Sequence, residues 1–185
     1  MQVISATMEH MLGRTYDTQV CSAARTLELV GERWSLLLIR DALFAGSRRF
    51  NDFLRLGIST NILASRLDGF VESGIMERRG SRSNPDVLEY VLTAKGRDLA
   101  PAIVTLTEWG DRWAAPNGPP VRYVHNVCGS PVTQQTVCAS CGRVHDPAEV
   151  GVRPGPGMPA DLAARMEARS TAPPSPAADA EASPR

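Results

Sequence analysis

The spacing of apolar residues along the first half of the chain predicts three helices in succession. Ser22–Val30 carries apolar residues among good helix formers, with Ser22 placed to cap it. Trp34–Phe44 is apolar nearly all round, which is typical of a central, buried helix. Phe50, Phe53 and Leu54 then recur at the i, i+3 and i+4 spacing of a short helix that packs inward.

A tight turn and a longer helix, residues 59–73, are predicted directly after this short helix. The turn is Leu56-Gly57-Ile58, and Ser59 is placed to cap the helix that follows. The side chains expected in the core are Leu63, Leu67, Phe70 and Val71. At about 100° per residue, the opposite face carries Asn61, Ser65 and Asp68. This helix is therefore amphipathic and presents a polar face.

Two candidate strands, Ile75–Arg79 and Leu88–Thr93, flank a loop rich in turn residues and predict a hairpin. Helix, turn, helix and hairpin in this order are the parts of a winged helix-turn-helix. Thr93 is placed to cap one more helix, and Pro101 fits the first turn of its continuation. The predicted fold class is therefore α+β.

A stripe of apolar residues follows the predicted domain core. Its members recur at i, i+4, i+7 and i+11 and are Ala102, Leu106, Trp109 and Trp113. Because the domain already has a core, two tryptophans on one stripe indicate a surface that binds a partner.

Composition and punctuation divide the 185 residues into five segments. We expect an N-terminal arm (1–16), a winged-helix domain for DNA binding and dimerisation (17–115), a linker (116–122), a small zinc-ribbon-like module (123–150) and a disordered Pro/Ala-rich tail (151–185). The tail has no aromatic residue, and only Asp161–Arg169 has a composition that favours intermittent helix.

Charge and hydropathy narrow the class of protein. The net charge is zero, which counts mildly against a nucleic-acid binder, but Gly46–Arg97 holds nine Lys/Arg against six Asp/Glu. The longest apolar run lies near Leu36–Ile39, far short of the ~20 residues that cross a membrane. The N-terminus also lacks a signal layout. We therefore expect a cytoplasmic protein without a membrane partner, with its cysteines reduced.

The outward N-terminal half of helix 59–73 and the arginines around it are the candidate DNA contacts. Small and amide side chains can approach base edges in a major groove, and arginine pairs with phosphate or guanine. The candidates are Arg48, Arg49, Ser59, Thr60, Asn61, Ala64, Ser65, Arg66, Arg79 and Arg82. For the helix alone a solvated face is the alternative, and for the arginines it is surface solubility. Arg78 is left outside the set because it is expected to face the hairpin.

A second constellation has the spacing of metal ligands. His125, Cys128, Cys138 and Cys141 follow the pattern H-x2-C-x9-C-x2-C, and both halves end in Cys-Gly. Four such ligands complete the tetrahedral coordination of a structural zinc ion. A module this small has too little core to be stable without a cross-link such as a bound metal. His145 competes with His125 as the fourth ligand. A redox pair at Cys138 and Cys141, or cysteines without a ligand, remain alternatives.

Cys21 stands alone at the start of a predicted helix, where the helix N-terminus lowers the pKa of a thiol. The preferred interpretation is a small apolar residue in a packing site, and a redox-sensing thiol is the alternative. The chain shows no nucleophile–base set and no phosphate-binding glycine loop, so we do not expect an enzyme.

The order of these residues resembles the HxlR family of bacterial transcriptional regulators, which are cousins of the MarR group. The resemblance rests on C-S-A-A-R-T-L-E-L-V-G-E-R-W from Cys21, R-F-N-D-F from Arg49, I-S-T-N-I-L-A-S-R-L from Ile58 and E-Y-V-L-T-A-K-G from Glu89. It implies a homodimer, joined through the N-terminal and last helices of the domain, on a two-fold operator. It also implies, for some members, sensing through a cysteine at the position of Cys21. Here Ser22 follows that cysteine where the family commonly has Pro. The cysteine module resembles a zinc-ribbon extension found on some members.

The predicted function is sequence-specific DNA binding by a homodimeric transcriptional regulator. Helix 59–73 would enter the major groove and the 75–93 wing would contact phosphates. Two alternatives remain: a thiol- or metal-responsive sensor, and a zinc-ribbon interaction module on a winged-helix scaffold. The sequence names no small-molecule effector.

Overall fold

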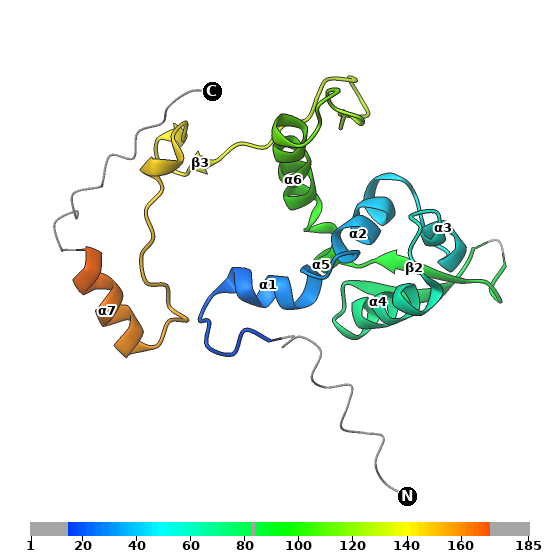
Figure 1. The fold of residues 1–185 in the computed structure, drawn as a ribbon, viewed down its shortest axis with the longest axis horizontal. Coiled ribbons are helices and arrows are strands. Elements are labelled where there is room, and N and C mark those ends of the chain that lie inside the picture. Colours follow the sequence, from blue (N-terminus) through cyan, green and yellow to red (C-terminus); the bar gives the residue numbers. More distant parts are fainter. Residues whose placement is uncertain (1–14, 83, 171–185) are drawn as a thin grey trace, which may run out of the picture. The chain divides into compact units, whose positions relative to one another are not determined.

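The computed structural model describes residues 15–82 and 84–170, and the chain divides into two compact units between Gln134 and Gln135. The first unit holds six helices and a two-stranded hairpin among these residues (Figure 1). They are α1 (Ser22–Val30), α2 (Ser35–Phe44), α3 (Phe50–Leu54), α4 (Thr60–Glu72), β1 (Met76–Gly80), β2 (Leu88–Leu92), α5 (Ala94–Arg97) and α6 (Ala100–Trp113). Residues 1–14, most of the predicted arm, lie outside the described residues.

The core of the first unit gathers around α2 and α4. Figure 1 shows α2 between α6 on one side and α3 with α4 on the other. Leu38 and Ile39 of α2 and Leu63 and Leu67 of α4 are fully buried. Phe53, Phe70, Ile75 and Met76 complete the same cluster. The expected core stripe of α4 is therefore confirmed, with Val71 packed partly buried against it.

Helix α2 differs from the sequence expectation at its ends. Trp34 precedes the helix as its N-cap, and Phe44 at its other end is 46% exposed. The helix is thus buried through its middle rather than throughout. The exposed ring of Phe44 lies 4.6 Å, centroid to centroid, from the ring of Tyr123. This contact attaches residues after α6 to the helical body.

The predicted turn and the helix after it are confirmed. Ser59 is the N-cap of α4, in an extended conformation, although its side chain makes no capping hydrogen bond. The Ile58 side chain just before it is buried and joins the core. Burial of one side chain next to the turn fixes how α4 leaves α3.

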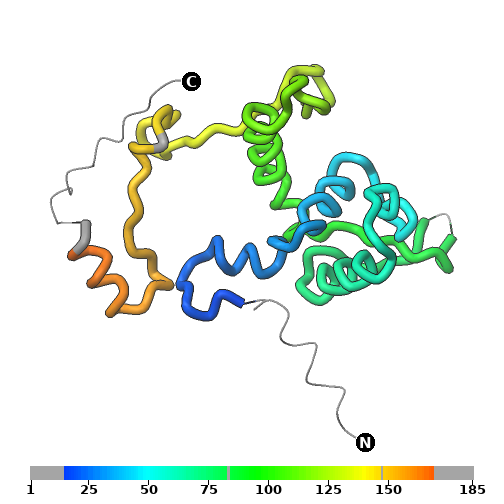
Figure 2. Tube along the Cα trace, in the orientation of Figure 1, coloured from blue at the N-terminus to red at the C-terminus, as the bar shows by residue number. Residues whose placement is uncertain are grey.

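The wing is a regular antiparallel hairpin that extends past α3 and α4 (Figure 2). Its register pairs Met76 with Leu92 at the base and Gly80 with Leu88 near the tip. The Tyr90 amide also donates to the Arg48 carbonyl at 2.7 Å. The segment before α3 is therefore bonded to the wing.

The base of the wing is joined to both neighbouring helices. The Thr93 hydroxyl donates to the carbonyl of Gly74 at 2.6 Å and accepts from the amide of Gly96 at 3.3 Å, so it caps α5 as predicted. Gly96 is buried, and a Cβ added there would lie 2.3 Å from the Ile75 carbonyl oxygen. Glycine is thus required for this backbone approach.

The second unit, described by itself, has little regular structure. It contains β3 (Val137–Cys138), β4 (Gly142–Arg143), a 3-10 turn (Pro147–Glu149) and α7 (Ala160–Ser170). The sequence indicated only intermittent helix near α7, within a segment expected to be disordered. Ala, Leu, Arg, Met and Glu are good helix formers, and Asp161 in the first turn suits the helix dipole. Residues 171–185 lie outside the described residues.

Within residues 15–82 and 84–170, no helix has the length and apolar content needed to cross a membrane.

Candidate nucleic-acid interface

The N-terminal half of α4 presents the face expected for base contacts. Thr60, Asn61 and Ser65 are exposed, and Ala64 is half-buried between this face and the core. All four precede the middle of a 13-residue helix that begins directly after the turn. Short polar side chains at the start of a helix allow its backbone to come close to a groove.

The wing carries three arginines in different surroundings. Arg78 forms an ion pair with Asp68 of α4 and lies over the ring of Tyr90, 5.6 Å from its centroid. Tyr90 first, and Asp68 second, raise the pKa of the Arg78 guanidinium. Arg78 therefore faces the hairpin, as the sequence indicated, and it connects the wing to α4. The same contact neutralises the negative charge of Asp68, which would otherwise repel a phosphate group.

Arg79 and Arg82, unlike Arg78, form no ion pair with α4 among the described residues and are available to bind a phosphate group. Arg79 is about half exposed and forms an ion pair with Glu77 on its own strand. Arg82 is exposed at the tip, and no ion pair among the described residues includes it. Exposed ion pairs contribute only about 0–1 kcal/mol, so a phosphate can replace Glu77 as the partner of Arg79.

Arg48 and Arg49 lie on the other side of the motif, just before α3. Their guanidinium groups are 4.0 and 3.8 Å from the carboxylate of Glu89, which the wing contributes. The Asp52 carboxylate accepts the backbone amides of Arg49 and Arg48 at 2.9 and 3.1 Å. These hydrogen bonds lower the pKa of Asp52. Capping by Asp52 fixes the backbone from which both arginines extend.

Two arginines depart from the sequence-based set. Arg66, predicted as a DNA contact, is only 19% exposed and pairs with Glu32 at 2.6 Å. Arg55, which was not predicted, is 83% exposed at the end of α3. Its place directly before the turn of the motif is the signal that could have identified it.

The four predicted zinc ligands form one pair within each unit. His125 Nδ1 lies 3.3 Å from Cys128 Sγ in the first unit, and Ser130 and then His125 lower the pKa of Cys128 to about 7. In the second unit, the amides of Cys141 and Ser140 lower the pKa of Cys138. Gly129 and Gly142, which follow Cys128 and Cys141, have φ of 70° and 87°.

In each pair a glycine with positive φ follows a cysteine, and backbone amides donate to sulfur. In residues 15–82 and 84–170, no group of three or more His, Cys, Asp or Glu side chains is gathered for a metal ion. The division of the chain after Gln134 falls within the predicted module 123–150. The four-ligand zinc site, including the choice between His125 and His145, stays a prediction.

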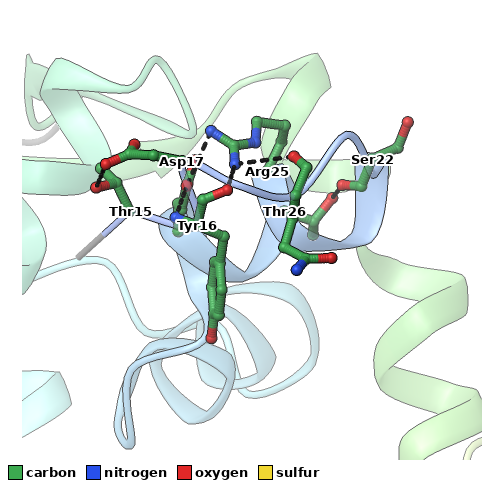
Figure 3. A network of polar contacts seen from close by, with 8 residues as sticks. Thr15, Tyr16, Asp17, Ser22, Arg25 and Thr26 are labelled. Carbon is green, nitrogen blue, oxygen red and sulfur yellow. Dashed lines mark hydrogen bonds and ion pairs between the residues drawn. The ribbon is translucent and has the colours of Figure 1, made fainter. Parts of the chain in front are cut away.

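Cys21 is the N-cap of α1, and its thiol is exposed. The described residues do not pack it, in contrast to the preferred sequence interpretation. The amides of Ala24 and Ala23 lower the pKa of this thiol. The segment before it is held to α1, because Arg25 donates to the carbonyls of Tyr16 and Gln19 (Figure 3).

The fold and the exposed helix face define a winged-helix transcription factor, and the comparisons agree. The HxlR-like helix-turn-helix family matches residues 29–118. The HTH-type transcriptional regulator Rv3095 of Mycobacterium tuberculosis is 46% identical over 144 residues, which cover 77% of this chain and 90% of the relative. YdeP of Bacillus subtilis, also an HTH-type transcriptional regulator, is 31% identical over 99 residues, or 52% of this chain and 77% of the relative.

Two solved structures share the fold over most of the chain. PA1607, a candidate transcription factor, superimposes with a TM-score of 0.66 at 37% identity, covering 74% of this chain and 96% of that one. PA1374 from Pseudomonas aeruginosa, described in the same terms, gives a TM-score of 0.54 at 38% identity, covering 78% and 99%. The chain belongs to the HxlR-like helix-turn-helix family of transcriptional regulators, which bind DNA.

Proposed function

We propose that the chain binds a two-fold duplex operator as a homodimer, with α4 in the major groove and the wing on neighbouring phosphates. The observation that carries this proposal is the placement of the exposed start of α4 beside a hairpin with an arginine at its tip. Asn61 and Ser65 supply donors and acceptors for base edges, and Arg82 supplies charge.

The phosphate contact is tested by Arg82→Ala. We expect weaker binding to every duplex sequence and a salt dependence of the binding constant that is shallower by about one phosphate contact. Fluorescence anisotropy with labelled duplexes at several salt concentrations measures both. Arg122→Ala removes an exposed arginine after α6 and is the matched control. Unchanged affinity and slope for Arg82→Ala would exclude the wing from the interface.

The base contact is tested by Asn61→Ala. Asparagine can pair with adenine through two hydrogen bonds, and the loss of such a pair costs about 1–3 kcal/mol of discrimination. We expect the preference at one base step to relax while binding to scrambled DNA is kept. Selection from a random duplex library, with the wild type in parallel, gives the two preference profiles. Identical profiles would contradict the role of Asn61.

Dimerisation is supported by apolar side chains that the described part of the chain leaves uncovered. Leu106, Trp109 and Trp113 of α6 are 51%, 60% and 69% exposed, and Leu27 of α1 is 47% exposed. These helices are the ones through which the family resemblance implies pairing. We expect Trp109→Glu to yield monomers in analytical ultracentrifugation, whereas Arg122→Ala stays dimeric. A monomeric wild type would remove this part of the proposal.

A thiol-responsive regulator is a second candidate, favoured by the exposed Cys21 thiol with its lowered pKa. A thiolate at neutral pH reacts faster with oxidants and electrophiles than a thiol does. We expect an oxidant to reduce operator binding by the wild type, and Cys21→Ser to prevent that loss. If Cys21→Ser loses binding as the wild type does, the sensing role belongs elsewhere.

A further inference from the structure

The ion pair between Arg66 and Glu32 joins the recognition helix to a different part of the fold. Arg66 lies in the middle of α4, and Glu32 lies in the short connection between α1 and α2. The Arg66 Nη2 and Glu32 Oε2 atoms are 2.6 Å apart. The Arg66 side chain is mostly covered, and its Nε atom is buried without a hydrogen-bond partner among the described residues.

The Arg66 side chain is directed toward Glu32 and is covered, unlike the exposed side chains of Asn61 and Ser65. Asn61 is exposed to solvent and lies outside the cavity of about 890 Å³ between α1 and α4, whereas Arg66 and Glu32, together with the exposed Ser65, contribute to its wall. A phosphate contact would require Arg66 to leave this covered position. It would also leave the Glu32 carboxylate without its partner. The first change opposes a direct role in DNA binding, because Arg66 would give up its covered position and its close partner.

Because of the position of Glu32, the ion pair links α4 to the connection that follows α1. Glu32 follows α1 by two residues, and α1 carries part of the apolar surface assigned above to dimerisation. The core fixes the distance of α4 from the body through Leu63 and Leu67. Apolar contacts have no direction, so they leave the rotation and tilt of the helix less well defined than a short, charge-assisted hydrogen bond does.

We propose that Arg66 is a positioning residue, which sets the orientation of the recognition helix through Glu32 and does not itself contact DNA. This proposal rests on the proposed operator binding and replaces the sequence-based assignment of Arg66 to the interface. Arg66 and Arg82 therefore act differently: the first determines how well bases are recognised, and the second how strongly any duplex is held.

A positioning role and a phosphate contact for Arg66 predict different effects of Glu32→Gln on operator binding. A positioning role predicts that Glu32→Gln and Arg66→Gln each weaken operator binding about tenfold. Affinity for scrambled duplex and the salt slope would stay at wild-type values. A phosphate contact predicts that Arg66→Gln weakens all duplexes and reduces the salt slope by about one, while Glu32→Gln leaves binding unchanged or strengthens it.

The experiment measures affinity at several salt concentrations for two probes, the duplex that the wild type selects from the random library, called the operator here, and a scrambled duplex. The proteins compared are both single variants, the double Gln variant and the exchange Glu32→Arg with Arg66→Glu. We expect the double Gln variant to be no weaker than either single variant, and the exchange to recover part of the loss. Arg82→Ala serves as the reference for a phosphate contact. Thermal unfolding of each variant shows whether it is folded, and Glu32→Gln, with its exposed carboxylate changed by one atom, serves if Arg66→Gln is not.

If Glu32→Gln binds the operator as tightly as the wild type does, the positioning role is overturned and the proposed function stays intact. A wild type that binds no duplex would instead overturn the proposed function, and the positioning role with it.

Discussion

The winged-helix body and the cysteine-bearing segment of this chain are stabilised in different ways. The body buries Phe53, Leu63 and Leu67 completely, and its helices and wing pack around them. The cysteine segment has short strands, and Val127 and Val137 within it are 87% and 65% exposed. A pattern of apolar residues therefore explains the body, whereas the segment 123–150 is built from turns and short strands with little apolar burial.

The largest expected effect is the removal of core volume from the body. Leu67→Ala should lower the free energy of unfolding by about 2–5 kcal/mol, because Leu67 is fully buried. Val127→Ala in the cysteine segment should change it by less than about 0.5 kcal/mol. Urea unfolding followed by tryptophan fluorescence measures both, since Trp34, Trp109 and Trp113 all lie in the first unit. Equal losses would remove the contrast.

A smaller loss is expected at the base of the wing. Gly96→Ala places a Cβ 2.3 Å from the Ile75 carbonyl oxygen and 2.7 Å from the side chain of Leu92. We expect a loss of about 1–3 kcal/mol in the same measurement. Gly110→Ala, in α6, has nothing within 4 Å of the added Cβ. It should be neutral or stabilising by up to about 1 kcal/mol. A neutral Gly96→Ala would show that the wing base is loosely packed.

Loss of the helix cap at Thr93 should lower the free energy of unfolding by less than Leu67→Ala or Gly96→Ala. Thr93→Ala removes the hydroxyl that bonds both Gly74 and Gly96, and we expect a loss of about 1 kcal/mol. Thr93→Ser keeps the hydroxyl and should retain most of the stability. Thermal unfolding of the two variants side by side measures the difference, and a Thr93→Ser variant as unstable as Thr93→Ala would contradict the capping role.

The smallest effect on the body is expected from metal removal. If the zinc prediction is correct, the purified protein contains one zinc ion per chain, and a chelator releases it together with the protection of Cys138 and Cys141 from alkylation. The tryptophan-detected unfolding midpoint should stay the same, because the body has its own core. Elemental analysis and mass-spectrometric mapping of alkylated cysteines measure this. Metal-free protein with cysteines that alkylate freely would favour cysteines without a ligand, whereas metal-free protein whose Cys138 and Cys141 alkylate only after reduction would favour the redox-pair alternative.

The parts of the fold that follow a repeating pattern were predictable from the sequence. The spacing of Leu63, Leu67 and Phe70 gave the orientation of α4, and Thr93 and Pro101 marked the starts of the last two helices of the body. In these cases the decisive interactions lie within a few residues along the chain. Arg78 was also expected to face the hairpin, and its contact with Tyr90 on the paired strand agrees.

The features that depend on distant partners were not predictable. Arg66 lies at the edge of the polar face by helix geometry, but its direction is decided by Glu32, which is 34 positions earlier in the chain. The contact of Tyr123 with Phe44 likewise joins segments that no periodicity connects. The exposure of Cys21 also depends on which parts of the fold come near it. Long or isolated side chains take their surroundings from the tertiary fold.

The threonine hydroxyl and the close backbone contact at the base of the wing have a consequence for the choice of operator. Together with the Asp68–Arg78 pair, they connect the wing to α4 and to the residues that follow it, and so limit how far the wing moves relative to α4. If α4 and the wing contact adjacent grooves as proposed, the protein sets the spacing between the two contacts. The duplex then has to bend or twist to fit that spacing. We therefore expect the bending and twisting preferences of base steps that the protein never touches to contribute to which sites it occupies.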